Sequence, residues 1–138
     1  MEVRCENCGQ VNHVPPLADG KKAICGKCQS PLKPGVTTMT TANFKGNVSD
    51  GGAWVIDFWA PWCGPCRMIS PIIEQLAGER SDVRFGKVNI DEQDALAVEF
   101  GVRSIPLLVL FKDGVERGRV VGAVPRGHIE AAIRQYLG

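Results

Sequence analysis

The sequence predicts an α/β protein: a three-layer α/β/α sandwich around a mixed central sheet, preceded by a small cysteine-rich segment. Three observations support this prediction. Apolar runs with the character of strands alternate with helical spacing from about residue 53 to the end of the chain. The pair Asp113-Gly114 is typical of a tight hairpin turn. The first 34 residues hold four of the six cysteines and few large apolar side chains.

The elements of the larger segment follow from these patterns. Thr41 is expected to cap a short helix that continues through Phe44 and Val48. Strands separated by helices predict parallel βαβ units, and the hairpin adds antiparallel strands at the end of the sheet. Because the strands are apolar throughout, helices are expected on both faces. Strands are predicted at residues 53–60, 83–90, 107–111 and 115–121, and helices at 64–79, 92–100 (stopped by Gly101) and 128–137.

Composition excludes several classes of protein. Hydrophobic residues make up 44% and charged residues 22%, and the net charge of +1 gives no indication of binding to nucleic acid or membranes. No stretch approaches the roughly 20 apolar residues that span a bilayer. The N-terminus has no apolar core after a basic start, so no secretory signal is predicted. We therefore expect a cytosolic, monomeric protein whose cysteines serve as metal ligands or redox catalysts.

Residues 1–34 are interpreted as a zinc ribbon, and residues 35–138 as the catalytic domain. The N-terminal segment buries too little surface to fold unaided, and binding of a metal ion would supply the missing free energy of folding. The spacing of two Cys-x-x-Cys pairs is typical of a closed structural zinc site, with Gly9 and Gly26 favouring the turns. Its ligands would be Cys5, Cys8, Cys25 and Cys28. The alternatives are disulfides or two further redox pairs.

A nucleic-acid-binding ribbon is disfavoured by the side chains around these cysteines. Residues 1–34 carry five basic and three acidic side chains and no aromatic residue that could stack on a base. His13 is interpreted as a loop residue, because four cysteines already complete the metal shell.

The third pair, Cys63-Gly64-Pro65-Cys66, follows the first buried strand and opens a helix. A helix N-terminus favours the thiolate, which is the nucleophile in disulfide exchange. Cys63, at the terminus, is expected to have an exposed sulfur and to attack the substrate. Cys66, one turn in, would resolve the mixed disulfide. Pro65 suits a first helical turn, and Pro71 is expected to kink the same helix. A metal site is the alternative, but residues 35–138 hold no second cysteine pair to complete it.

The segment around this pair resembles the active-site sequence of the thioredoxin family. It runs Trp59-Ala60-Pro61-Trp62-Cys63-Gly64-Pro65-Cys66-Arg67-Met68, and further similar pieces follow in the family's order along residues 36–138, namely Val55-Ile56-Asp57-Phe58-Trp59, Lys87-Val88-Asn89-Ile90-Asp91, Arg103-Ser104-Ile105-Pro106 and Val121-Gly122-Ala123. The whole chain resembles bacterial two-domain members that carry an N-terminal zinc ribbon.

The resemblance implies roles for individual residues. Asp57 would be the buried carboxylate beside the cysteines, with a raised pKa, taking the proton from Cys66. A carboxylate satisfied by backbone donors is the alternative. Lys87 would tune Asp57, and Pro106 would be the cis-proline facing the disulfide, although a proline opening a strand could simply mark its boundary. The substrate surface would comprise Trp62, Gly64, Pro65, Ile105, Pro106, Gly122 and Ala123. Leu107 stands where many members have threonine.

The resemblance also implies partners and a direction of electron flow. Electrons would come from NADPH through thioredoxin reductase, and the substrates would be proteins that contain disulfides. Gly64-Pro65 between the cysteines is typical of reducing members, whereas oxidising relatives often carry histidine there. A second hypothesis is a zinc-linked redox sensor or stress-responsive binding protein, since zinc-bound thiolates remain oxidisable.

Overall fold

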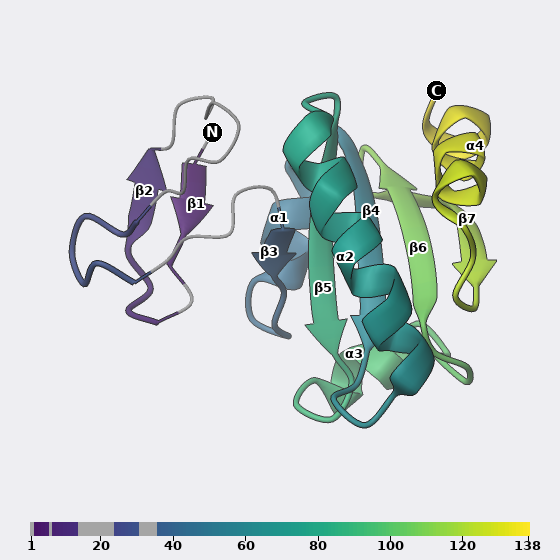
Figure 1. The fold of residues 1–138 in the computed structure, drawn as a ribbon, viewed down its shortest axis with the longest axis horizontal. Helices are drawn as coiled ribbons and strands as arrows, with labels where there is room; N and C mark the ends of the chain where they lie inside the picture. The colour runs from purple at the N-terminus through teal and green to yellow at the C-terminus, as the bar shows by residue number, and fades with distance from the viewer. Residues whose placement is uncertain (1, 6, 14–23, 31–35) are drawn as a thin grey trace.

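The larger part of the chain forms a five-stranded mixed sheet with the strand order β3-β5-β4-β6-β7 (Figure 1). The computed structural model describes residues 2–5, 7–13, 24–30 and 36–138. The strands are β3 (Val36–Thr38), β4 (Ala53–Trp59), β5 (Val83–Asn89), β6 (Leu107–Lys112) and β7 (Val115–Val121). The predicted mixed sheet is therefore confirmed.

Strand direction changes in the middle of the sheet. β3, β5 and β4 run parallel, with Asp57 of β4 opposite Lys87 of β5. β6 runs antiparallel to β4, and the hairpin to β7 is antiparallel as predicted, with an irregularity between Leu110 and Phe111. This topology brings the ends of β4 and β5 and the start of β6 to the same edge of the sheet.

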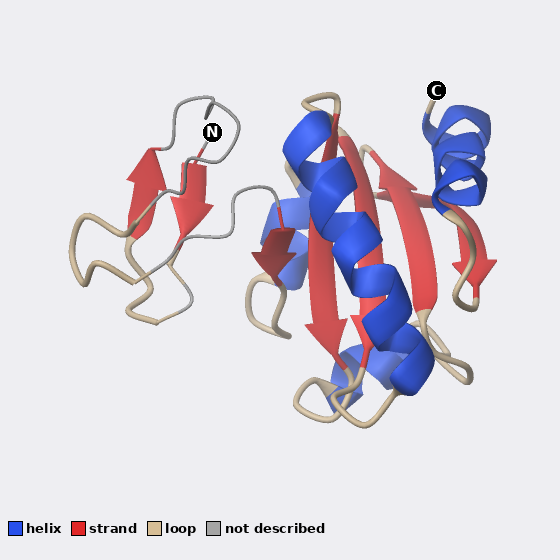
Figure 2. Cartoon of the chain, viewed as in Figure 1, coloured by secondary structure: helices blue, strands red, loops and turns tan. Residues whose placement is uncertain are grey.

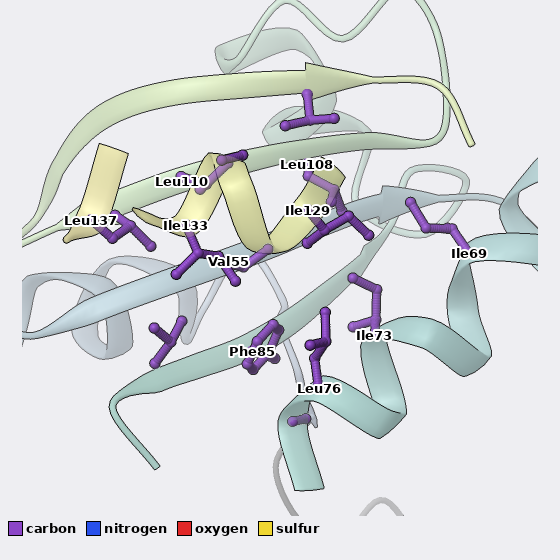
Figure 3. Close-up of a cluster of buried hydrophobic side chains, with 14 residues drawn as sticks. Val55, Ile69, Ile73, Leu76, Phe85, Leu108, Leu110, Ile129, Ile133 and Leu137 are labelled. Carbon is purple, nitrogen blue, oxygen red and sulfur yellow. The ribbon is translucent and has the colours of Figure 1, made fainter. Parts of the chain in front are cut away.

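Helices cover both faces of the sheet, which completes the predicted three layers (Figure 2). They are α1 (Phe44–Ser49), α2 (Gly64–Glu79), α3 (Asp94–Glu99) and α4 (Arg126–Leu137). On one face, Ile73 of α2 and Ile133 of α4 pack with Val55, Phe85 and other apolar residues (Figure 3). Each such side chain contributes about 1.5–3 kcal/mol by its burial.

The opposite face is covered by α1 and α3. Phe44 of α1 and Leu96 of α3 pack there against even-numbered residues of β4, such as Ile56 and Phe58. Because side chains alternate along a strand, Asp57 must point to the other face, beneath α2. That alternation places a carboxyl group under the helix that carries the cysteines.

The structure moves the starts of three predicted helices: α3 begins at Asp94 rather than at residue 92, and α4 begins at Arg126 rather than at residue 128. It also adds β3 to the larger sheet. The N-cap of α1 is Asn43 rather than Thr41, whose backbone N–H and hydroxyl instead donate to Oε1 of Gln93 at 2.9 and 3.0 Å. Gly101 follows α3 with a φ of +59°, as its predicted role as a stop requires. β3 was not predicted, because three residues are too short to show a pattern.

The N-terminal part contains a two-stranded antiparallel sheet of β1 (Glu2–Arg4) and β2 (Val11–His13). His13 therefore lies in a strand rather than in the predicted loop. Residues 31–35, whose prolines and glycine predict a short linker, lie outside the described residues, as do residues 14–23. Within the described residues, no helix is both long and apolar enough to cross a membrane.

Candidate functional site

Cys63 and Cys66 lie where β4 passes into α2, and they form a disulfide. Cys63 is the N-cap of α2, and its Sγ accepts the backbone N–H of Cys66 at 3.2 Å. Pro65 occupies the first turn, where a missing N–H costs nothing. The helix therefore presents a hydrogen-bond donor and its positive end to the Cys63 sulfur, and both stabilise a thiolate there.

The exposed sulfur predicted for Cys63 is not seen in this disulfide form. Cys63 is 4% exposed and Cys66 3%, and they form a small cluster with Ala60. Ile105 and the neighbouring half-buried Trp59 pack against this cluster, and the carbonyl oxygen of Ile105 lies 3.9 Å from Cys63 Sγ. Sequence alone could not show this cover, because Ile105 reaches the cysteines from a distant loop.

Asp57 is buried beneath α2, at 4% exposure, in the position predicted for the carboxylate. Its Oδ1 has no hydrogen-bond partner among the described residues, so the alternative of full satisfaction by backbone donors does not hold for that atom. Burial raises the pKa of Asp57 from 3.8 to about 7, and the positive charge of Lys87 opposes this rise. A group with this pKa gains and loses protons near neutral pH.

A cavity of about 380 Å³ is lined by both the carboxyl group of Asp57 and Cys66. Asp57, Lys87 and Cys66 all line it, together with Ser70 and Glu74 of α2. A cavity of this size has room for water, and water held by its charged and polar side chains could carry a proton between groups that are not in contact. Ser70 and Glu74 were not predicted, although their helical spacing from Cys66 placed them on its side of α2.

Exposed apolar side chains lie close to the cysteines in the sequence and at the end of β7. Trp62 is 67% exposed, Met68 is 70% exposed and Val121 is 60% exposed. The indole N–H of Trp62 donates to both carboxylate oxygens of Asp91, at 3.2 and 3.1 Å. Met68, Val121 and Asp91 were not among the predicted surface residues, and the contact of Asp91 with Trp62 joins segments that are distant in the sequence.

The remaining predicted residues fall into two groups. Gly64, Pro65 and Ala123 are exposed, and Gly122 is half-buried at the end of β7. The Ile105–Pro106 peptide bond is cis, and Pro106 is buried just before β6. Leu107 is only 4% exposed and packs in the core on the side of α1 and α3.

Sequence comparison matches residues 35–135 to the thioredoxin family. The chain belongs to that family. It is 43% identical over 104 residues to a thioredoxin of Porphyra purpurea, covering 74% of this chain and 97% of the relative. It is 46% identical over 101 residues to thioredoxin 1 of Synechococcus elongatus, covering 72% and 94%.

The fold agrees with this assignment. A solved mutant thioredoxin from Halobacterium salinarum superposes with a TM-score of 0.70 at 36% identity, covering 77% of this chain and 93% of that one. With the disulfide between Cys63 and Cys66, these relationships identify the chain as a protein-disulfide oxidoreductase.

The four N-terminal cysteines lie outside the residues that match the thioredoxin family. Their four Sγ atoms lie within 4.8 Å of one another. Cys5 Sγ is 3.5 Å from Cys28 Sγ, and Cys8 Sγ is 3.6 Å from Cys25 Sγ. A tetrahedral shell with Zn–S bonds of about 2.3 Å sets neighbouring sulfurs about 3.8 Å apart. The cluster is therefore compatible with one metal ion and with a four-thiolate donor set.

The two cysteine pairs lie in knuckles with the same backbone hydrogen bonds. Cys5 donates its N–H to the Gln10 carbonyl and Cys25 donates to the Ser30 carbonyl, at 2.8 and 2.9 Å. Gly9 and Gln29 occupy equivalent positions with φ of +80° and +61°. The predicted role of Gly26 is wrong, because the left-handed residue of the second knuckle is Gln29.

Proposed function

We propose that the chain reduces disulfides in protein substrates by dithiol exchange. The Cys63 thiolate attacks one substrate sulfur, forming a mixed disulfide and releasing the other substrate sulfur as a thiolate. Cys66 then attacks Cys63 Sγ, which restores the Cys63–Cys66 disulfide and releases the second substrate thiolate. The observation that carries this proposal is the N–H of Cys66 directed at Cys63 Sγ from the start of α2.

Asp57 serves as the base for the resolving step. Cys66 must lose its proton before it can attack, and Asp57 shares a cavity with it. A carboxyl group with a pKa of about 7 can accept that proton at neutral pH. Lys87 lowers this pKa from the opposite strand, so it adjusts the pH at which the base works.

The substrate docks on the exposed apolar surface around the disulfide. Trp62 supplies a large apolar side chain held by Asp91. Ile105 offers its backbone beside Cys63, in a position to pair with an extended substrate. The rest of this surface would be formed by Gly64, Pro65, Pro106, Gly122 and Ala123.

The direction of reaction follows from the residues between the cysteines. Gly64 and Pro65 add no cation that would stabilise the reduced form, which favours a reductant over an oxidant. Electrons would be supplied by NADPH through thioredoxin reductase, as the family relationship implies. A reducing cytosol suits this role and keeps the four N-terminal thiols available as ligands. We propose that the chain works there as a monomer.

The N-terminal cysteines hold one structural zinc ion. Cys5, Cys8, Cys25 and Cys28 would complete a tetrahedral shell with no open position, so the ion would supply folding energy and no hydrolytic chemistry. On this proposal residues 1–34 are one domain and residues 35–138 another.

A second function is favoured by one observation on this cluster. Cys8 is exposed, whereas Cys5 and Cys25 are buried. An accessible zinc thiolate can be oxidised, so the ribbon could act as a redox sensor that alters binding to partners. The two functions can coexist in one chain.

Mixed-disulfide trapping tests the reductase proposal. Cys66→Ser should accumulate a covalent complex between Cys63 and a disulfide-containing protein such as insulin, because resolution is blocked. Cys63→Ser serves as the matched control and should trap nothing. A Cys63→Ser variant that reduced insulin at the normal rate would disprove the assignment of the nucleophile.

A further inference from the structure

The two cysteine pairs of the N-terminal cluster differ in the side chains that face them. The Asn12 side-chain amide donates to Cys25 Sγ at 3.5 Å, and that of Asn7 donates to Cys28 Sγ at 3.6 Å. The Ser30 side chain also hydrogen-bonds to Cys28. Among the described residues, no side-chain amide or hydroxyl group faces the sulfur of Cys5 or Cys8.

The backbone donors explain part of this difference. The N–H of Gln10 faces Cys8 as that of Ser30 faces Cys28, but the N–H of Lys27 also donates to Cys25 Sγ at 3.4 Å. The side-chain donors add to this asymmetry, and both amides come from the first half of the ribbon and donate to the second pair of cysteines.

Asn12 is held in place by two further contacts. Its Oδ1 accepts the backbone N–H of Gly26 at 2.9 Å, and its amide nitrogen also lies 3.1 Å from the Gln10 carbonyl oxygen. One side chain thus joins β2, the first knuckle and the second knuckle. Outer hydrogen bonds of this kind orient metal ligands and change metal affinity about 10- to 100-fold when removed.

Hydrogen bonds to a thiolate also lower its reactivity. An N–H group directed at the sulfur stabilises the negative charge, and a less basic thiolate is a weaker nucleophile. Cys25 and Cys5 are both protected by burial, and Cys25 also accepts the side-chain amide of Asn12. Cys28 is half-buried and depends more on its donors, whereas Cys8 is exposed without such a side-chain donor among the described residues.

We propose that Cys8 is the site at which soft electrophiles modify and open the metal cluster, while Asn7 and Asn12 clamp Cys28 and Cys25 as the durable ligand pair. In the reaction with an alkyl halide, the Cys8 sulfur forms a bond to carbon as the carbon–halogen bond breaks and halide leaves. The alkylated sulfur no longer carries the charge that binds the metal. This inference rests on the zinc site proposed above.

Limited alkylation of the zinc-loaded chain tests the inference. The Cys63–Cys66 disulfide is kept intact so that it does not react, and iodoacetamide is added below one equivalent. Peptide mass spectrometry locates the label, and a chromophoric chelator follows zinc release. Cys8 should carry most of the first label, with zinc release rising in parallel.

Three substitutions test whether the hydrogen bonds from Asn7 and Asn12, and not exposure of the sulfurs alone, set the rates of labelling and zinc release. Asn7→Ala should increase labelling of Cys28 about tenfold, and Asn12→Ala should increase the rate of zinc release about tenfold. Asn12→Asp keeps an acceptor for Gly26 but removes the donor and places a negative charge beside Cys25, so it should release zinc faster still. If Asn12 served only to accept the N–H of Gly26, the Asn12→Asp variant would release zinc at the wild-type rate. His13→Ala, at the next residue of β2, is the matched control and should leave both rates unchanged.

Failure of the proposed zinc site can be distinguished from failure of the inference about Cys8. A chain that takes up no zinc, as measured by elemental analysis before labelling, contradicts the proposed metal site. A zinc-loaded chain labelled equally at all four cysteines, or first at Cys28, contradicts the inference alone. Wild-type rates of zinc release in both Asn12→Ala and Asn12→Asp would also overturn the clamp.

Discussion

The same Cys-x-x-Cys pattern occurs in two settings in this chain, and the surrounding backbone decides its chemistry. Cys63 and Cys66 begin a helix, where one N–H group and the helix dipole act on a single sulfur. The other two pairs lie in short knuckles, the first of them between β1 and β2, and their four sulfurs converge on one point. A helix start favours one reactive thiolate, whereas paired knuckles favour a shared metal ion.

The two regions also differ in what stabilises them. Residues 36–138 bury two apolar clusters, one on each face of the sheet. The described N-terminal residues include buried cysteines, but Val11 and Ile24 are 43% and 60% exposed. The larger region is therefore stabilised by its core, whereas the proposed metal ion would supply most of the stability of the smaller one.

The largest expected effect comes from the same substitution made in both regions. Cys63→Ser should lower insulin reduction to the uncatalysed rate, because a serine hydroxyl cannot replace a thiolate in disulfide exchange. Cys8→Ser should leave that rate close to wild type. Equal losses in the two variants would show that the regions are not chemically separate.

Removal of the buried carboxyl group should stabilise the larger region in a pH-dependent way. The folded pKa of about 7 lies above the ordinary 3.8, so the folded state binds the proton more tightly and loses stability as pH rises between these values. A rise of this size corresponds to about 4 kcal/mol. Asp57→Asn should therefore raise the free energy of unfolding by about that amount above roughly pH 8.

Urea denaturation across pH measures this gain, which should disappear below about pH 4. Asp91→Asn is the matched control at a carboxylate outside the core. A gain for Asp57→Asn that did not vary with pH would contradict the raised pKa. The same variant should resolve mixed disulfides more slowly, because Cys66 loses its base.

A core truncation should separate the two regions by stability. Phe85 is fully buried, and Phe85→Ala should lower the free energy of unfolding by about 3–5 kcal/mol. Val11→Ala in the N-terminal region should change it by less than about 0.5 kcal/mol. All three tryptophans lie at positions 54, 59 and 62, so their fluorescence reports on the larger region alone. A shift of that fluorescence transition on zinc removal would show coupling between the regions.

The smallest expected effect compares the two knuckles. Gln29 holds the left-handed conformation that Gly9 holds in the first knuckle, at a cost of about 1–2 kcal/mol for a residue with a side chain. Gln29→Gly should tighten zinc binding by roughly tenfold, and Gly9→Ala should weaken it similarly. Competition with a chelator of known affinity measures both, and a weaker site in Gln29→Gly would contradict the strain argument.

The predictions from sequence succeeded where a local pattern determines the structure. The bounds of α2 were obtained in full, because apolar spacing, Pro65 and the cysteines all mark the same helix. The mid-strand position of Asp57 correctly predicted its burial. Convergence of the four N-terminal cysteines also followed from spacing alone.

Other features depend on contacts between distant segments, which one sequence does not display. Ile105 covers Cys63 and Asp91 binds Trp62 only because separate loops meet at one edge of the sheet. Thr41 looked like a helix cap, but its N–H and hydroxyl donate to the side chain of Gln93, which is distant in the sequence. Gln29 adopts a conformation that its residue type does not suggest.

The reduction potential of the Cys63–Cys66 couple tests the central claim most directly. It would be measured by equilibration with a glutathione buffer, with zinc bound and after its removal. A reductase should have a value of about −270 mV, as reducing thioredoxins do, and zinc removal should leave it unchanged. A value of about −120 mV would identify an oxidant and contradict the proposed function.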